Sequence, residues 1–195
     1  MAAPSEFVAY GGLIYLDDEA GRCVCSSGLG TSAEDAVVST HALADLHLRQ
    51  DFAAKAAFVV EAPGTWTALH AYKEACERLG LSLLEAQTTP ETRAAYKKCE
   101  REVERNAQEN SSATSKVLRF GMVVQLLHHA SGKYLASSQK QAAVSGRGHR
   151  VTLDAHAGNA GLFRVMTCLR VHSEGERYVR ARSPLLLPSR LPCFC

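Results

Sequence analysis

Short runs of alternating apolar and polar residues near both ends of the chain predict β-strands, because side chains alternate between the two faces of a strand. In residues 9–27, an apolar run reaches a small-residue turn at Gly21 and leaves through a second apolar run. Residues 119–138 repeat this pattern around Gly132. Glycine tolerates the positive φ that a tight hairpin demands. Both stretches are therefore predicted to be antiparallel hairpins.

The two hairpins resemble each other when one is shifted by 111 residues. The shift aligns Leu16 with Leu127, Gly21 with Gly132, Arg22 with Lys133, Val24 with Leu135, and Ser26-Ser27 with Ser137-Ser138. A third, fainter copy runs from Phe163 to Ser183, with Gly175 in its turn. Three such units bury their inward faces only when they associate, which predicts a closed, mainly β architecture. The three-fold β-trefoil fits this pattern. Unrelated hairpins are the alternative that this pattern leaves open.

Between the first two hairpins, the apolar period changes to about 3.6, which predicts helix. Along one side, the first predicted helix carries Trp66, Leu69, Tyr72, Lys73, Cys76 and Leu79, with Thr65 as its cap and Gly80 at its end. The second has Thr89 as its cap, Pro90 in its first turn, and a thin stripe of Ala95, Cys99, Val103 and Ala107. We interpret residues 65–110 as a helical arm inserted between β lobes, whose apolar stripes serve mainly each other. Residues 110–115 are expected to form a flexible return into the second lobe.

Composition adds that the chain is globular, because 195 residues with 46% hydrophobic residues can bury one core and carry an appendage. A formal net charge of +2 is too small to indicate nucleic-acid or membrane binding through overall charge. No apolar run approaches the roughly 18 residues of a membrane span. The start lacks the pattern of a secretory signal, so the seven cysteines are expected to be reduced thiols in a cytosolic compartment.

Pairs of metal-ligating residue types occur at His128-His129, Cys23/Cys25 and Cys193/Cys195, and none has the spacing of a metal site. His128 and His129 are adjacent on a predicted strand, so their rings point to opposite faces and cannot hold one ion without a bulge. We expect one ring to pack near the hairpin and the other to face solvent. Cys23 and Cys25 are closer in sequence than a zinc-binding C-x2-C pair, and small buried strand residues are the favoured interpretation over a metal site.

No catalytic pattern stands out in the sequence. The nucleophile elbow, the Walker loop, the zinc-protease motif and the dinucleotide fingerprint are all missing. Asp17, Asp18 and Glu19 occupy the turn of the first hairpin, where acidic residues are usually solvated. We therefore predict a protein that is not an enzyme, with no catalytic residue, cofactor or metal.

Arginine is concentrated towards the C-terminus, with eight arginines against three acidic residues from Arg147 onward. Guanidinium groups match phosphate oxygens in pairs, so Arg177, Arg180 and Arg182 are a candidate anion site. Arg180 and Arg182 also alternate with small apolar neighbours, as on the solvent face of a strand. A solvated face or a protein contact is favoured over a phosphate site.

The second hairpin and the segment after it resemble the amino-terminal domain of the inositol 1,4,5-trisphosphate receptor, in the family that it shares with ryanodine receptors. The matching residues are Phe120-Gly121, Gln125 to His128, Ser131, Lys133 to Leu135, Arg150 to Asp154 and Gly158-Asn159. The likeness extends more thinly from residue 7 to about residue 187, and includes Leu29-Gly30. It implies a β-trefoil over residues 5–187 with a helix-turn-helix arm at 65–110, followed by a divergent tail at 188–195.

The resemblance also implies a function, that of the suppressor or coupling domain of a large tetrameric calcium-release channel. Such a domain lies on the cytosolic side of the endoplasmic reticulum or another internal calcium store. In the family, basic residues of the following domains hold the ligand, so the resemblance assigns no ligand-binding residue to this segment. Contacts with those domains and with neighbouring subunits are expected at Leu29, Lys133 and Tyr134. The alternative is a free-standing β-trefoil that binds an anionic sugar or phosphoinositide through Arg177, Arg180 and Arg182.

Three departures from the family pattern bear on that function. The basic residue expected before Ser131 is Ala130, and the arginine expected after Phe52 is Ala53. Both changes weaken the inhibitory contact that the resemblance implies. After Leu187 the chain ends in PSRLPCFC, without the final hairpins of a third lobe. Either the chain is a fragment or a prematurely ended product, or the third lobe is unusually degenerate.

Overall fold

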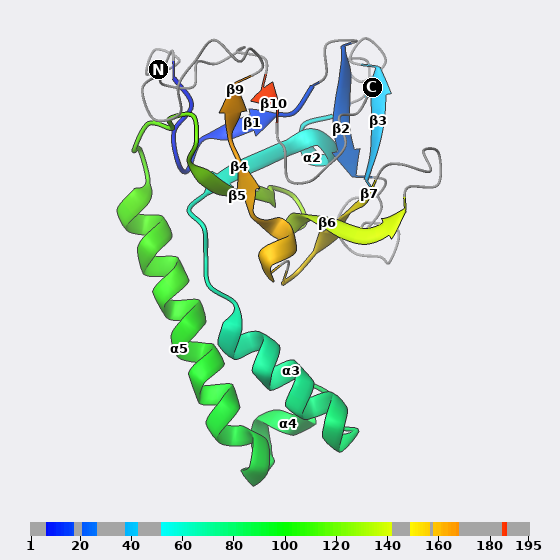
Figure 1. The fold of residues 1–195 in the computed structure, drawn as a ribbon, viewed down its shortest axis with the longest axis vertical. Helices are drawn as coiled ribbons and strands as arrows, with labels where there is room; N and C mark the ends of the chain where they lie inside the picture. Colours follow the sequence, from blue (N-terminus) through cyan, green and yellow to red (C-terminus); the bar gives the residue numbers. More distant parts are fainter. Residues whose placement is uncertain are drawn as a thin grey trace.

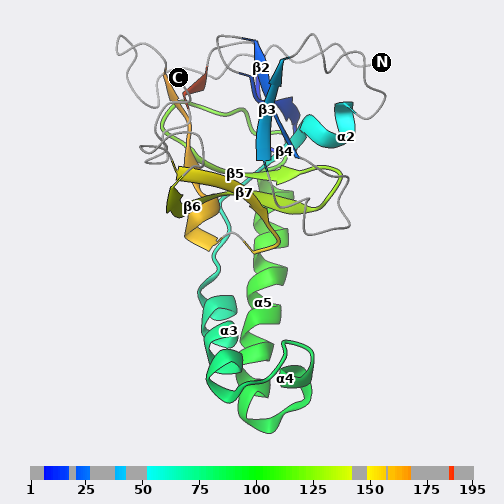
Figure 2. The ribbon, with the colours of Figure 1, turned by 90° about the vertical axis from the view of Figure 1, so that its right-hand side faces the viewer.

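The computed structural model describes residues 7–17, 21–26, 38–42, 52–141, 149–156, 158–167 and 185–186. These residues form a body of β-strands, the β body, from which a pair of helices projects (Figures 1 and 2). We call residues 67–113 of this projection the arm. Both views place the arm at one end of the molecule and the strands at the other.

The β body is built from antiparallel pairs. Its largest sheet has the order β1 (Leu13–Tyr15), β4 (Ala57–Glu61), β5 (Val123–His128), β6 (Lys133–Gln141) and β7 (His149–Asp154), with β8 (Phe163–Arg164) paired to β5. Two smaller sheets pair β2 (Arg22–Ser26) with β3 (Val38–Ala42), and β9 (Met166–Thr167) with β10 (Leu185–Leu186). Helix α2 (Phe52–Ala56) leads into β4, and the short 3-10 helix η2 (Gly158–Gly161) precedes β8. The described chain is thus mainly antiparallel sheet with a few helices, as the sequence predicts.

The second predicted hairpin forms, and the first is borne out only in part. In the first, β1 pairs with β4 and β2 with β3, Asp17 and Cys23 form an isolated antiparallel bridge, and residues 18–20 lie outside the described ranges. Gly21 has φ 71° and Gly132 has φ 62°, which side chains with a Cβ rarely adopt. In the second hairpin, β5 and β6 pair directly, with Leu127 opposite Tyr134. The predicted turn of the third copy, at Gly175, lies outside the described residues.

The two halves also share a hydrogen-bond pattern that an ungapped alignment does not reveal. In each half, a glycine with positive φ donates its N–H to a buried valine carbonyl at 2.7 Å, and that valine donates back to the residue after the glycine. The partners are Gly11, Val60 and Gly12 in the first half, and Gly121, Val165 and Met122 in the second. These glycines are 110 residues apart, whereas the turn glycines are 111 apart, so one extra residue in the second copy hides the match.

Apolar side chains gather in separate clusters in the β body and the arm. The largest fully buried ones in the β body are Phe58, Phe163 and Leu126. The arm has its own cluster, made of Leu69, Tyr72, Cys76, Ala86 and Cys99. The expectation that the apolar stripes of the arm serve mainly each other is confirmed for the residues of this cluster. Ala113 at the end of α5 belongs instead to the core of the β body, and apart from it the arm is attached by other contacts.

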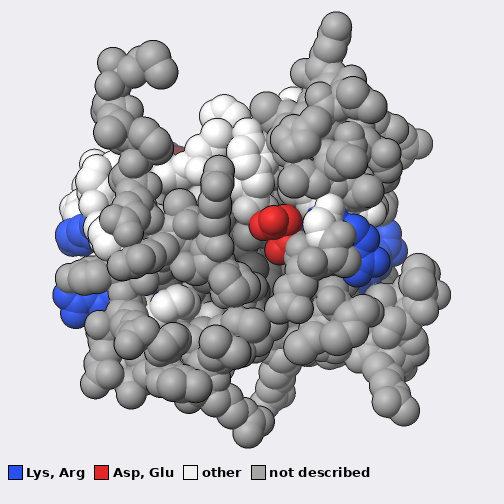
Figure 3. All heavy atoms as spheres, turned by 90° about the horizontal axis from the view of Figure 1, so that it is seen from above, with Lys and Arg blue, Asp and Glu red and all other residues white. Residues whose placement is uncertain are grey.

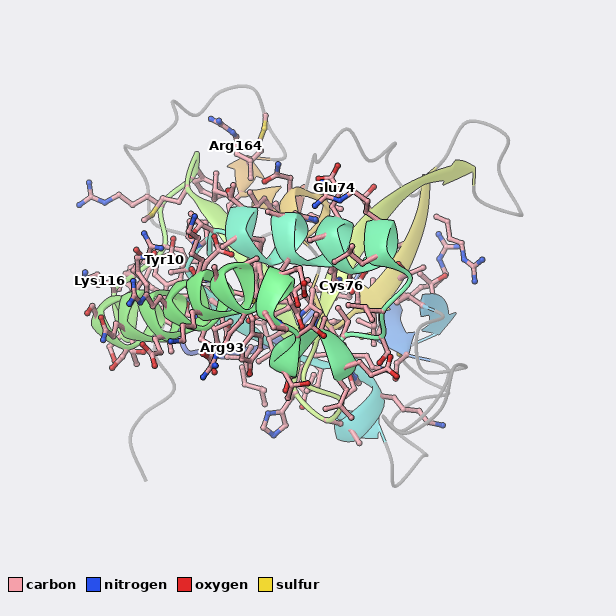
Figure 4. The ribbon with its side chains drawn as sticks, turned by 90° about the horizontal axis from the view of Figure 1, so that it is seen from below. Tyr10, Glu74, Cys76, Arg93, Lys116 and Arg164 are labelled. Carbon is pink, nitrogen blue, oxygen red and sulfur yellow. The ribbon has the colours of Figure 1, made fainter. Side chains whose placement is uncertain are left out.

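The arm consists of α3 (Thr67–Leu79), α4 (Glu85–Thr88) and α5 (Pro90–Ala113). Helix α3 ends at Gly80 in the left-handed conformation, and α5 has Pro90 in its first turn, both as predicted. Thr89 holds the predicted N-cap position, but its hydroxyl donates to the Glu85 carbonyl and does not cap α5. Figure 4, seen from below, shows α3 and α5 side by side. Cys76 lies on the side of α3 towards α5, and Glu74 points away.

Several predictions about the arm are wrong. The N-cap of α3 is Trp66 rather than Thr65, and no side chain near it in sequence caps the helix. Leu79 is 45% exposed, and on α5 both Val103 and Ala107 are exposed. The expected flexible return at 110–115 is helical as far as Ala113. The buried face of α5 instead carries Thr92, Cys99, Glu102, Asn106 and Ala113. Most of that face is polar because it contacts backbone rather than a hydrophobic core.

Candidate functional site at the base of the arm

The candidate site is the junction, the place where the chain leaves β4, passes through residues 62–66 and enters α3. These five residues have no regular secondary structure. Their backbone groups make no ladder hydrogen bonds, so side chains must supply partners wherever water is excluded. Helix α5 supplies most of these partners from one face, through Glu102, Asn106 and Asn110. Residues four apart lie one above the other on a helix, so the three side chains form a polar row.

Two asparagines of this row hold the connecting segment like additional strand partners. The Oδ1 of Asn110 accepts the N–H of Ala62 at 2.7 Å. The Oδ1 of Asn106 accepts the N–H of Thr65 at 3.0 Å, and its Nδ2 donates to the carbonyl of Thr65 at 2.8 Å. From the sheet, the buried Gln125 accepts the N–H of Gly64 at 3.0 Å. The segment is thus fixed from both the arm and the β body.

Glu102 performs the capping that the sequence assigned to Thr65. Its two carboxylate oxygens accept the N–H groups of Ala68 and Leu69, each at 3.0 Å. These are among the first N–H groups of α3, which have no partner within their own helix. Glu102 is only 4% exposed, so its negative charge lies against the positive end of the α3 dipole with little water to screen it. One helix is therefore capped by the other.

Glu61 joins the arm to the hairpin that contains Tyr134. Its Oε2 accepts a hydrogen bond from the Tyr134 hydroxyl at 2.9 Å and another from Nδ2 of Asn110 at 3.0 Å. The ring of Tyr134 meets the ring of Trp66 edge to face, with centroids 5.5 Å apart. Burial raises the pKa of the Tyr134 phenol, and the neighbouring Glu61 carboxylate raises it further. A residue expected to contact other domains thus also orients the arm.

The raised pKa of Tyr134 predicts a loss of stability at alkaline pH. The folded state favours the neutral phenol, so this stabilisation is complete below the ordinary tyrosine pKa of about 10 and declines as pH rises above it. Tyr134→Phe should lower the free energy of unfolding by about 1.5 kcal/mol at neutral pH, because the hydrogen bond to Glu61 is lost. It should also reduce the decline between pH about 10 and about 12. Urea denaturation across this range measures both effects, and equal pH dependence in the two proteins would contradict the assignment.

A second contact between arm and β body is steric. Gly158 in η2 has φ 55°, and a Cβ built there would meet the ring of His70 on α3. Glycine leaves room for the end of this exposed ring, so η2 and α3 approach closely here. The Gly158-Asn159 pair of the sequence resemblance therefore lies against the arm.

Gly158→Ala should lower the free energy of unfolding by about 2 kcal/mol, mainly through left-handed backbone strain. The double variant Gly158→Ala/His70→Ala should recover a small part of that loss, because the exposed ring can turn away from the new methyl group. Thermal unfolding of the wild type, both single variants and the double variant gives the coupling energy. If His70→Ala brings no recovery, η2 and α3 do not approach closely at this ring.

The remaining candidate residues occupy different places. Lys133 is half-buried in β6, next to the turn, and Leu29, Arg177, Arg180 and Arg182 lie outside the described residues. His128 is fully buried, with Nδ1 2.8 Å from the Ser131 Oγ, while His129 is exposed, as predicted. Of the two departures from the family pattern, Ala130 is exposed in the turn and Ala53 lies in α2.

Cys23 and Cys25 are buried beside Ala56, which agrees with their interpretation as small strand residues. Hydrogen bonding to Cys25 and burial raise the pKa of the Cys23 thiol. Within the described ranges, no three His, Cys, Asp or Glu side chains are grouped as a metal site would need. The helices of those ranges include none with the length and apolar character to cross a membrane.

Sequence reasoning missed the polar row of α5. Glu102, Asn106 and Asn110 repeat at the helical spacing of four, but a search for apolar periodicity passes over them. The signal that could have found them is a set of polar residues on one face of a helix whose apolar stripe is too narrow to account for its burial. What the arrangement can do chemically is hold a helical arm at a defined angle to a sheet.

One comparison with known proteins bears on the identity of this chain. A family model described as "Inositol 1,4,5-trisphosphate/ryanodine receptor" matches residues 3–194. The matched range contains the β body, the junction and the arm, and extends beyond the likeness seen in the sequence at both ends.

Proposed function

The chain belongs to the inositol 1,4,5-trisphosphate/ryanodine receptor family, and from that premise we propose that it acts as an N-terminal regulatory domain of a calcium-release channel. This is a family of channel receptors rather than of enzymes. The domain would couple ligand binding in the following domains to gating, through contacts with those domains and with neighbouring subunits. The match over residues 3–194 is the observation that carries the proposal.

We further propose that residues 5–187 form a β-trefoil with a helical insertion at 65–110, which contains most of the arm. The hydrogen-bond pattern shared by the glycines Gly11 and Gly121 supports a repeated unit. The apolar clusters of the β body and the arm are separate except for Ala113 at the end of α5, which supports an insertion. Residues 188–195 are treated as a divergent tail.

The junction supports the coupling role. Coupling requires the channel to have at least two states that differ in the contacts of this domain. The domain transmits such a difference when its arm and its β body move together. The polar row of α5, Glu61 and Tyr134 connect the arm to the sheet by direct hydrogen bonds. A displacement of the arm would therefore also displace β5 and β6, because no flexible linker separates them. We propose Leu29, Lys133 and Tyr134 as contact residues, with the domain in the cytosol beside an internal calcium store such as the endoplasmic reticulum.

The alternative of a free-standing module for anionic sugars or phosphoinositides depends on Arg177, Arg180 and Arg182, which lie outside the described residues. Figure 3 views the face opposite the arm. Its described basic side chains stand at opposite edges, with acidic side chains between them. No observation on the described residues favours this alternative.

The coupling role is tested in a chimera, in which residues 1–195 replace the first domain of a family channel whose ligand-binding region is intact. Inositol 1,4,5-trisphosphate affinity is measured for the chimera and for the same channel lacking any first domain. We expect the two dissociation constants to differ by about fivefold or more, the usual lower range for coupled sites. Equal constants would reject a coupling role.

A further inference from the structure

A groove of about 560 Å³ runs along one flank of the arm, between α3 and α5. On the α3 side it is lined by the small residues Thr67, Ala68 and Ala71, and on the α5 side by the cations Lys98, Arg101 and Arg105. We call these six residues the arm groove. Thr65 and Glu102 of the junction also line it, so the groove begins at the base of the arm.

The three cations of the arm groove form a row without partners. They are three and four residues apart, so they share one face of α5 and span about 10 Å of its axis. None of them forms an ion pair with a carboxylate of the residues that the structure describes. Cations at this spacing repel one another unless an anion lies between them.

Glu102 also borders the groove, but its single negative charge offsets only part of the three positive charges in this row. Both of its carboxylate oxygens accept N–H groups at the start of α3. Its negative charge is therefore directed to the positive end of that helix. The groove keeps an excess of positive charge, which would attract an acidic partner.

The α3 side of the groove indicates which kind of acidic partner fits. Thr67, Ala68 and Ala71 have short side chains, which let a third backbone approach the pair of helices closely, at the 8–10 Å typical of packed helices. A single phosphate contacts only a small part of a row about 10 Å long. Carboxylates placed three and four residues apart on a helix have the same rise as the cations.

We propose that the arm groove docks an acidic amphipathic helix of a partner protein. Its carboxylates pair with Lys98, Arg101 and Arg105, and its small or apolar face packs on Ala68 and Ala71. The docked helix completes a three-helix bundle with α3 and α5. This inference concerns the partner of the arm and holds whether or not the domain couples to a ligand site.

The test uses the full chain and a synthetic helical peptide that carries glutamates three and four residues apart beside a face of alanine and leucine. Binding is measured by fluorescence anisotropy at low salt. We expect saturable binding that weakens at least tenfold when Lys98, Arg101 and Arg105 are all changed to alanine. A peptide with glutamine in place of glutamate should bind at least tenfold more weakly, because charge pairing is lost.

The matched control changes Arg78, Arg93 and Lys97 to alanine, which removes three exposed cations of the arm outside the groove. Arg93 points away from α3 in Figure 4. This variant should bind the peptide as the wild type does. Ala71→Trp fills the groove without changing charge and should abolish binding, while circular dichroism verifies that every variant keeps its helices.

Three outcomes would overturn the proposal. They are equal binding of the glutamate and glutamine peptides, equal losses in the two triple variants, or peptide binding that survives Ala71→Trp. Inorganic phosphate is titrated in parallel as a separate probe. Saturable phosphate binding at the same three cations with no peptide binding would assign the groove to a small anion instead.

Discussion

Replacing Phe58 with alanine is expected to lower the free energy of unfolding by about 4 kcal/mol, because the change leaves a cavity in a core that cannot fully collapse. Phe58 is fully buried in β4, where it pairs with Ile14 of β1 on one side and His128 of β5 on the other. Its ring also packs on the ring of His128, with centroids 5.3 Å apart. Urea denaturation followed by circular dichroism and by the fluorescence of Trp66 measures the loss.

The fluorescence is informative because Trp66 is the single tryptophan and lies at the junction. If the β body and arm unfold together, both signals shift to the same lower urea concentration. The control is Leu13→Ala on the neighbouring strand β1, where the side chain is 51% exposed and should cost less than about 1 kcal/mol. Equal losses in the two variants would show that Phe58 is not in the core described here.

Glu102→Ala is expected to lower the free energy of unfolding by about 3 kcal/mol, a large effect for a residue outside any hydrophobic cluster. The change leaves the N–H groups of Ala68 and Leu69 without their partner at the start of α3. The Leu69 donor is buried and carries the full cost of desolvation when it is unpaired, whereas the Ala68 donor is only partly buried beside the arm groove. Glu102→Gln should be intermediate, because it keeps an acceptor and loses the charge.

The control for this prediction is Glu104→Ala, two positions along the same helix, where the glutamate is exposed. That change should alter the free energy of unfolding by no more than about 0.5 kcal/mol. Thermal and urea unfolding monitored by circular dichroism compare the three variants. A loss in Glu102→Ala no larger than in Glu104→Ala would mean that Glu102 does not cap α3.

The elements that the sequence predicted best are those set by local chemistry. Gly132 marks the turn between β5 and β6 because the backbone there has positive φ, and Gly21, directly before β2, has positive φ as well. Gly80 and Pro90 mark helix ends because each has a specific role at a terminus. These signals are short and need no knowledge of the rest of the fold.

The buried face of α5 could not be predicted from apolar periodicity, because it is selected by contacts distant in sequence. Asn106 and Asn110 are buried or half-buried since residues 62–66 lack ladder partners there. Val103 is exposed because no apolar surface of the arm reaches it. Thr65 loses its expected capping role because Glu102, 37 positions later, supplies two acceptors at once.

The same distinction applies to the candidate site. Family resemblance pointed to Tyr134, and the structure adds why its hydroxyl has a function inside the chain, namely its hydrogen bond to Glu61. Glu61 is 73 positions away, so no local pattern connects the two. The basic row at Lys98, Arg101 and Arg105 was also overlooked, because the sequence analysis sought positive charge only near the C-terminus.

The affinity of the isolated chain for inositol 1,4,5-trisphosphate tests the central claim most directly. Isothermal titration should give no saturable heat, because a domain that works through protein contacts has no need of a ligand site of its own. The variant Arg180→Ala/Arg182→Ala should behave identically. Micromolar binding by the wild-type chain that disappears in this variant would contradict the account and favour an anion-binding module.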